Sequence, residues 1–164
     1  MKHDQAISIF QEIQARPYRV SEKINTPANN CYFKGIELLQ RLGSLGYTVR
    51  GRVGETAWDN KLITAEILNL YDVSFKVTHF VTEIHLNGRW RFLDPSYPIS
   101  LRKHGFKVGS WDKGTLCFPI TKLYMQKQSL EYQQEWFSPG YAESYFKKNA
   151  PFFKAFNAWI SKFD

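Results

Sequence analysis

Residues 79–95 read HFVTEIHLNGRWRFLDP, two strand-like runs separated by Asn87-Gly88. An Asn-Gly pair in this position is the strongest short-range signal of a β-hairpin, because a type I′ turn requires positive φ at both central residues. If these two residues form the loop, the register of the hairpin places Val81 opposite Asp94. The stretch therefore predicts a two-stranded ribbon whose pairing is fixed by its turn.

The same register brings two titratable groups together at the open end of the ribbon. His79 and Asp94 lie on one face and are diagonal neighbours across the two strands. Such neighbours have Cα atoms roughly 7–8 Å apart, which is within reach of long side chains. An imidazole and a carboxylate in that relation can hydrogen-bond, so the hairpin predicts a His–Asp pair.

The other predicted elements surround this hairpin. Apolar residues at helical spacing predict helices over 4–15 and 31–46, and alternation predicts a strand over 47–53. Helices outside an antiparallel sheet are typical of the α+β class. We expect one domain over residues 1–164, with a C-terminal helical extension over about 126–164. Two segments leave alternatives open: 58–72 could hold a short helix or a strand, and 115–125 could be another strand, which Pro119 would place near a sheet edge.

Composition narrows the class of protein. The chain has 164 residues, 43% of them hydrophobic, which favours a folded domain with its own core. The net charge of +7 comes from cations in ones and twos, and no nucleic-acid-binding motif is present, so we expect no nucleic-acid partner. No apolar run reaches the roughly 20 residues of a membrane span. With two cysteines and no signal-peptide pattern, we expect a cytoplasmic protein with free thiols and no membrane association.

No residue pattern predicts a metal or a cofactor. No cluster of His, Cys or carboxylate residues has zinc spacing, and no acidic loop resembles a calcium site. The glycine-containing stretch GRVGE at 51–55 lacks the Lys-Ser/Thr of a phosphate-binding loop. We therefore expect chemistry carried by side chains alone.

Cys31 opens the second predicted helix. Asn is a preferred N-cap residue, and Asn29-Asn30 directly precede the cysteine, so Cys31 falls in the first helical turn. The helix dipole and the free N–H groups there stabilise a thiolate, which is the reactive form of cysteine. Gly35 follows one turn later. Glycine inside a helix costs roughly 0.5–1 kcal/mol relative to alanine, which indicates a close packing demand against the sheet.

Each of the three residues has an ordinary structural interpretation. A cysteine in such a chain is most often a small buried apolar residue, a strand histidine is usually satisfied by a local partner, and Asp-Pro often ends a strand. Their combination favours chemistry. A cysteine at a helix start, with a histidine and an acid paired across a hairpin, matches a nucleophile, a base and an orienting carboxylate.

Two stretches resemble the transglutaminase-like superfamily. NNCYFKGIELLQRLGSLGYTVRGRV (29–53) is similar to its nucleophile segment, and THFVTEIHLNGRWRFLDPSYP (78–98) is similar to its histidine and aspartate motifs. The resemblance covers residues ~5–98, and its most specific feature is the order Cys, His, Asp. It implies a papain-like fold in which a nucleophile helix packs on an antiparallel sheet. It also implies that Cys31 is the nucleophile, His79 the base and Asp94 the orienting group.

The resulting expectation is a thiol-dependent acyl-transfer enzyme that acts on an amide or ester of a protein or peptide through a thioester. The backbone N–H of Cys31 would help to hold the oxyanion. The second nucleophile stays open: water gives peptidase, amidase or deamidase activity, and an amine gives transamidation. The alternative is a catalytically silent transglutaminase-like module that binds a protein. The candidates for a side-chain oxyanion donor are Asn25, Asn29, Asn30 and Trp58.

Overall fold

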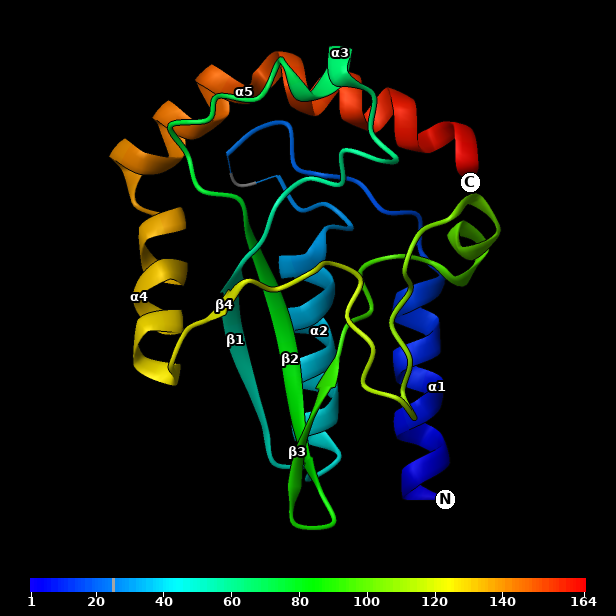
Figure 1. Cartoon of the computed structure of the whole chain (residues 1–164). Helices are drawn as coiled ribbons and strands as arrows, with labels where there is room; N and C mark the ends of the chain where they lie inside the picture. The colour runs from blue at the N-terminus through cyan, green and yellow to red at the C-terminus, as the bar shows by residue number, and fades with distance from the viewer. Residues whose placement is uncertain (25) are drawn as a thin grey trace.

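The computed structural model describes residues 1–24 and 26–164, and its centre is a four-stranded sheet in the order β3-β2-β1-β4 (Figure 1). All neighbouring strands run antiparallel. The strands are β1 (Val49–Glu55), β2 (Thr78–Leu86), β3 (Arg89–Leu93) and β4 (Lys122–Leu123). With helices on the outside, this arrangement confirms the predicted α+β class.

In the described part of the chain, five α-helices pack around the sheet. Figure 1 shows α2 running alongside the strands with α1 beside it, while α5 crosses the end of the sheet at which α2 begins. Among the described residues, no helix is long and apolar enough to cross a membrane. The helices are α1 (Lys2–Ala15), α2 (Cys31–Ser44), α3 (Ala65–Leu68), α4 (Gln126–Trp136) and α5 (Pro139–Ile160), with 3-10 turns η1 (Ile99–His104) and η2 (Ser161–Phe163).

The predicted hairpin is confirmed in both turn and register. Asn87 and Gly88 have φ values of 51° and 77°, as a type I′ turn requires. The ladder between β2 and β3 ends at the pair Thr82–Leu93, one pair short of Asp94. Asp94 is therefore the first residue after the ladder, and its side chain contacts His79.

The possible strand over 115–125 is confirmed at its predicted place on the sheet edge, but only over Lys122–Leu123, which pair with β1 as β4. The earlier part of the segment, around Cys117, is not in a strand. The reason is visible in the hydrogen bonds of the segment, since the Cys117 N–H donates to the Asp94 carboxylate and not to a neighbouring strand. In the ambiguous segment 58–72, the structure has the short helix α3.

The ring of Phe80 joins α2 to the sheet between two glycines. A Cβ added at Gly35 of α2 would lie 2.5 Å from the ring, and one added at Gly51 of β1 would lie 2.4 Å from it. The Thr82 hydroxyl also donates to the Gly35 carbonyl at 2.9 Å. The close packing predicted from Gly35 is thus present, and it fixes how near the start of α2 comes to β2.

We expect Gly35→Ala to lower the free energy of unfolding by roughly 1–3 kcal/mol, because overpacking a closed site costs that much and the Phe80 ring has no room to retreat. Gly140→Ala is the matched control, since an added Cβ there meets no atom within 4 Å. Urea denaturation of both variants measures the difference. Equal stability of the two variants would contradict the packing described here.

Candidate active site

His79 and Asp94 form a buried pair at the open end of the hairpin. His79 lies near the start of β2 and Asp94 directly follows β3, with exposed fractions of only 1% and 0%. The His79 Nε2 atom and the Asp94 Oδ2 atom are 2.7 Å apart. This is the contact that the hairpin register predicts.

Four groups share the Asp94 carboxylate. Oδ1 accepts hydrogen bonds from the Ser96 N–H at 3.1 Å and from the Ser96 hydroxyl at 2.6 Å. Oδ2 accepts from the Cys117 N–H at 2.8 Å in addition to its contact with His79. Burial by itself raises the pKa of this carboxyl, but His79 and the hydrogen bonds outweigh burial and lower it below its usual value. Asp94 is therefore held as a carboxylate.

The charge of Asp94 decides the protonation of His79. Burial by itself lowers the pKa of His79, but the Asp94 carboxylate and the neighbouring Cys31 raise it to about 10. The imidazolium is thus the favoured form at neutral pH. Because Nε2 is engaged by Asp94, Nδ1 is the ring nitrogen left to serve Cys31.

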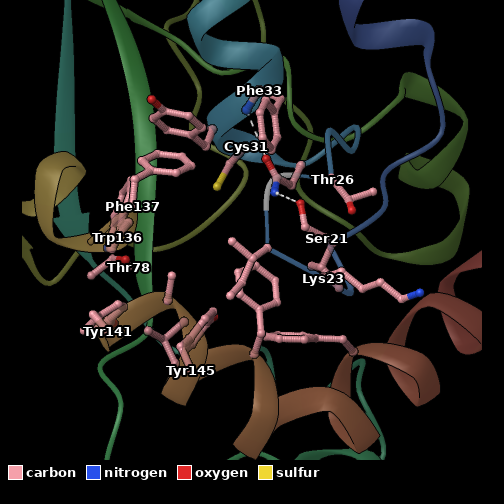
Figure 2. Close-up of a pocket in the computed structure, with 18 of the residues that line it drawn as sticks. Ser21, Lys23, Thr26, Cys31, Phe33, Thr78, Trp136, Phe137, Tyr141 and Tyr145 are labelled. Carbon is pink, nitrogen blue, oxygen red and sulfur yellow. Dashed lines mark hydrogen bonds between the residues drawn. The ribbon is translucent and has the colours of Figure 1, made fainter. Parts of the chain in front are cut away.

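Cys31 is the first residue of α2, as predicted, and its side chain is half-buried. Asn30 is the N-cap, and its side-chain oxygen accepts from the Phe33 N–H at 3.0 Å. Figure 2 shows the Cys31 sulfur directed away from the helix into a pocket. Cys31 also contributes to the raised pKa of His79, which indicates that the cysteine lies near the imidazole and shares a site with the His79–Asp94 pair.

The candidate oxyanion donors differ in whether their N–H groups already make hydrogen bonds within the protein. The Trp58 Nε1 atom is buried with no hydrogen-bond partner in the part of the chain that the structure describes, and Trp58 lines the same pocket as Cys31. The Asn30 amide is already used, because it caps α2 and donates to the Ser21 hydroxyl at 3.3 Å. Asn29 is half-buried beside the cap, and Asn25 lies outside the described residues.

The segment around Gly109, which has no recognisable motif, packs against the backbone of Asp94. Gly109 lies so close to Asp94 that an added Cβ would be 1.8 Å from the Asp94 carbonyl oxygen. The Gln14 side chain of α1 donates to the Gly109 carbonyl at 2.9 Å and holds this segment in place. That Ser96 donates to Asp94 can be predicted from the sequence, since Asp side chains often accept a hydrogen bond from the backbone two residues further on. No local sequence pattern predicts the contact of Gly109 with Asp94.

Lys34 is a buried cation next to this site. It has 1% exposure, and its ammonium donates to the backbone carbonyls of Gln14, Arg16 and Ser96 at 3.4, 2.5 and 2.9 Å. The three carbonyls belong to the end of α1 and to the turn after Asp94, so Lys34 fastens both to α2. Burial is the main reason that the pKa of Lys34 is lowered to about 7.

Cys117 has a different environment from Cys31. Its side chain is 5% exposed, and burial together with the nearby Asp94 raises the pKa of its thiol well above the usual value. Among residues 1–24 and 26–164, no three His, Cys, Asp or Glu side chains are grouped so that they could hold a metal ion.

Comparison with known proteins adds no further identification. No family model matches the chain, and neither the curated proteins nor the solved structures contain a match. The interpretation of the site therefore depends on its own residues and geometry.

The opposite pKa shifts of Lys34 and His79 predict a measurable effect of pH on stability. Above about pH 7, folded Lys34 has released a proton that the unfolded chain still holds, so its contribution to stability rises with pH. Folded His79 retains its proton up to about pH 10 while the unfolded chain loses it near 6.5, so its contribution falls over that window.

Lys34→Met removes only the first contribution. We expect the free energy of unfolding of this variant, relative to wild type, to decrease by up to roughly 1 kcal/mol per pH unit above pH 7. The lost carbonyl contacts add an offset that does not depend on pH. Urea denaturation from pH 6 to 9 measures the trend, with exposed Lys103→Met as the control. A difference that is constant across this range would show that Lys34 does not titrate as described.

Proposed function

We propose that this protein is a thiol-dependent acyl-transfer enzyme of the transglutaminase-like type, with Cys31 as nucleophile, His79 as general base and acid, and Asp94 as orienting carboxylate. The observation that carries the proposal is the buried His79–Asp94 pair at 2.7 Å, adjoining a half-buried cysteine at a helix N-terminus that faces a pocket. Burying two ionisable groups is costly unless they are paired, and here the pair stands beside a group that it can activate.

The chemistry follows from the protonation states. His79 already carries a proton on Nδ1 in the resting site, so the nucleophile is the Cys31 thiolate paired with this imidazolium, and it attacks the carbonyl carbon of an amide or ester. The tetrahedral intermediate then collapses, the imidazolium returns its proton to the departing nitrogen or oxygen, and a thioester remains on Sγ. In the second step His79, now neutral, takes a proton from the water or primary amine that attacks the thioester, and Cys31 leaves as the thiolate beside the restored imidazolium. Asp94 keeps the ring oriented and stabilises its positive charge throughout.

Two donors are available for the oxyanion. The N–H of Cys31 is in the first turn of α2, where backbone donors have no partner within the helix. The Trp58 indole N–H is the side-chain candidate that combines a free donor with a place in the Cys31 pocket. Removing one such donor costs about 2.7–4 kcal/mol of transition-state stabilisation in enzymes where it is measured.

The arrangement of the elements supports a papain-like fold as part of this proposal. The nucleophile opens α2, α2 packs on the antiparallel sheet through Gly35, and the histidine and aspartate come from adjacent positions of one hairpin. The substrate we propose is an amide or ester of a protein or peptide.

Acylation by p-nitrophenyl acetate tests the proposal. We expect the acetyl group to appear on Cys31 as a hydroxylamine-sensitive thioester, with p-nitrophenolate released in equal amount in the first turnover, while Cys117 stays unmodified because it is buried. His79→Gln should slow the release at pH 7 at least about tenfold, since Cys31 loses the imidazolium that holds its proton and stabilises its thiolate. Peptide mapping by mass spectrometry and nitrophenolate absorbance give the two readouts.

The matched control is His85→Gln, which changes an exposed histidine of the same strand. It should acylate at the wild-type rate. Modification of Cys117 in any variant reports loss of the fold and disqualifies that measurement. Acylation of wild-type Cys31 at the rate of the His79 variant would contradict the triad and favour a silent binding module.

A further inference from the structure

The pocket beside Cys31 is an aromatic cavity that the proposed chemistry does not explain. Its volume is about 150 Å³, and Cys31 is one of its lining residues. Figure 2 shows Trp136, Phe137, Tyr141 and Tyr145 lying across the cavity from the start of α2. These four side chains come from α4, α5 and the turn between them, so the C-terminal third of the chain builds one wall of the site.

The aromatic wall is tied directly to the nucleophile helix. The Tyr32 ring, next to Cys31, makes edge contacts with Trp136 at 5.7 Å and with Phe80 at 5.4 Å between ring centroids. It also contacts Phe137 at 5.1 Å. On the far side, the rings of Tyr141 and Tyr145 stack at 5.9 Å. The rings that bound the cavity therefore pack against one another, and these contacts keep them from turning into the cavity.

The size of the cavity and the polarity of its lining limit the kind of chemical group that it can bind. An apolar cavity of about 150 Å³ in another protein stays dry and binds benzene, so the volume here suits a single six-membered ring. Among the described residues that line the cavity there is no carboxylate, and the lining includes Lys23 and Lys76. Aromatic walls can also attract cations, but the described lining offers no carboxylate to hold a positively charged ring, and it includes the Lys23 ammonium; the Lys76 ammonium is paired with Glu55 at 2.7 Å.

We propose that this cavity is the acyl subsite of the enzyme and that it takes a neutral aryl group joined through a short link to the scissile carbonyl. This inference rests on the proposed function. The acyl side is favoured because the acyl group stays bonded to Cys31 Sγ after the first step, and Cys31 itself lines the cavity. The buried Trp58 N–H lines the same cavity and is available to the carbonyl oxygen of that acyl group.

The test compares two esters with the same leaving group. We expect p-nitrophenyl phenylacetate to acylate Cys31 at least about tenfold faster than p-nitrophenyl acetate, because the ring becomes buried only in the first case. Phe137→Ala should reduce this ratio, since Phe137 lines the cavity but is 47% exposed and is not needed for the core. Leu130→Ala on α4, where the leucine is 50% exposed and does not line the cavity, should keep the wild-type ratio.

A second variant fills the cavity instead of opening it. Ala142 lines the cavity from α5, so Ala142→Leu should also lower the ratio, with exposed Ala158→Leu on the same helix as its control. Equal rates for the two esters, or a faster reaction with an ester carrying a trimethylammonium group on its acyl part, would overturn the subsite.

Binding to the Cys31→Ser variant separates this inference from the proposed function. Phenylacetamide, followed by ligand-observed NMR, should bind this variant, and Ala142→Leu added to it should weaken binding. If no ester acylates wild-type Cys31 yet phenylacetamide binds in this way, the proposed function fails while the aryl site stands. If esters acylate Cys31 without ring preference and phenylacetamide does not bind, the subsite fails while the function stands.

Discussion

The structure depends on the burial of one ion pair, His79 with Asp94, at the open end of a hairpin. An ionised carboxylate removed from water is tolerated only when its lone pairs are satisfied and an opposite charge is near. The fold meets this demand with the Ser96 turn and the Cys117 N–H, both directed at the carboxylate. The region after β3 is therefore organised by hydrogen bonds to one side chain and not by a sheet.

A second constraint positions the nucleophile relative to that pair. The absence of side chains at Gly35 and Gly51 lets the Phe80 ring fill the space between α2 and β1. Lys34, one turn after Cys31, fastens the same helix to the turn that follows Asp94. The position of Cys31 is thus set from two sides, by apolar contact with the sheet and by a buried cation. The C-terminal helices then enclose the space in front of the sulfur.

Much of the site, but not its surroundings, could be predicted from the sequence. Asn87-Gly88 fixes the hairpin and hence the His79–Asp94 contact, and Asn30 fixes the start of the helix at Cys31, because both are local rules of turn and cap geometry. The approach of Gly109 to Asp94 and the aromatic wall of α4 and α5 depend on contacts between distant segments, for which no local pattern exists. The strand expected over 115–125 is shorter than the sequence suggests, limited to Lys122–Leu123, for the same reason, since the Cys117 N–H donates to Asp94.

The protonation of His79 is the most direct test of this account. Ring ¹⁵N shifts of histidine-labelled protein, assigned by comparison with His79→Gln, show whether both ring nitrogens carry protons. The account predicts that His79 is an imidazolium at pH 8, about 1.5 units above the usual histidine pKa, and that Asp94→Asn abolishes this state. A His79 ring that is neutral at pH 8 and titrates near pH 6.5 in wild type would contradict the buried ion pair and the chemistry proposed from it.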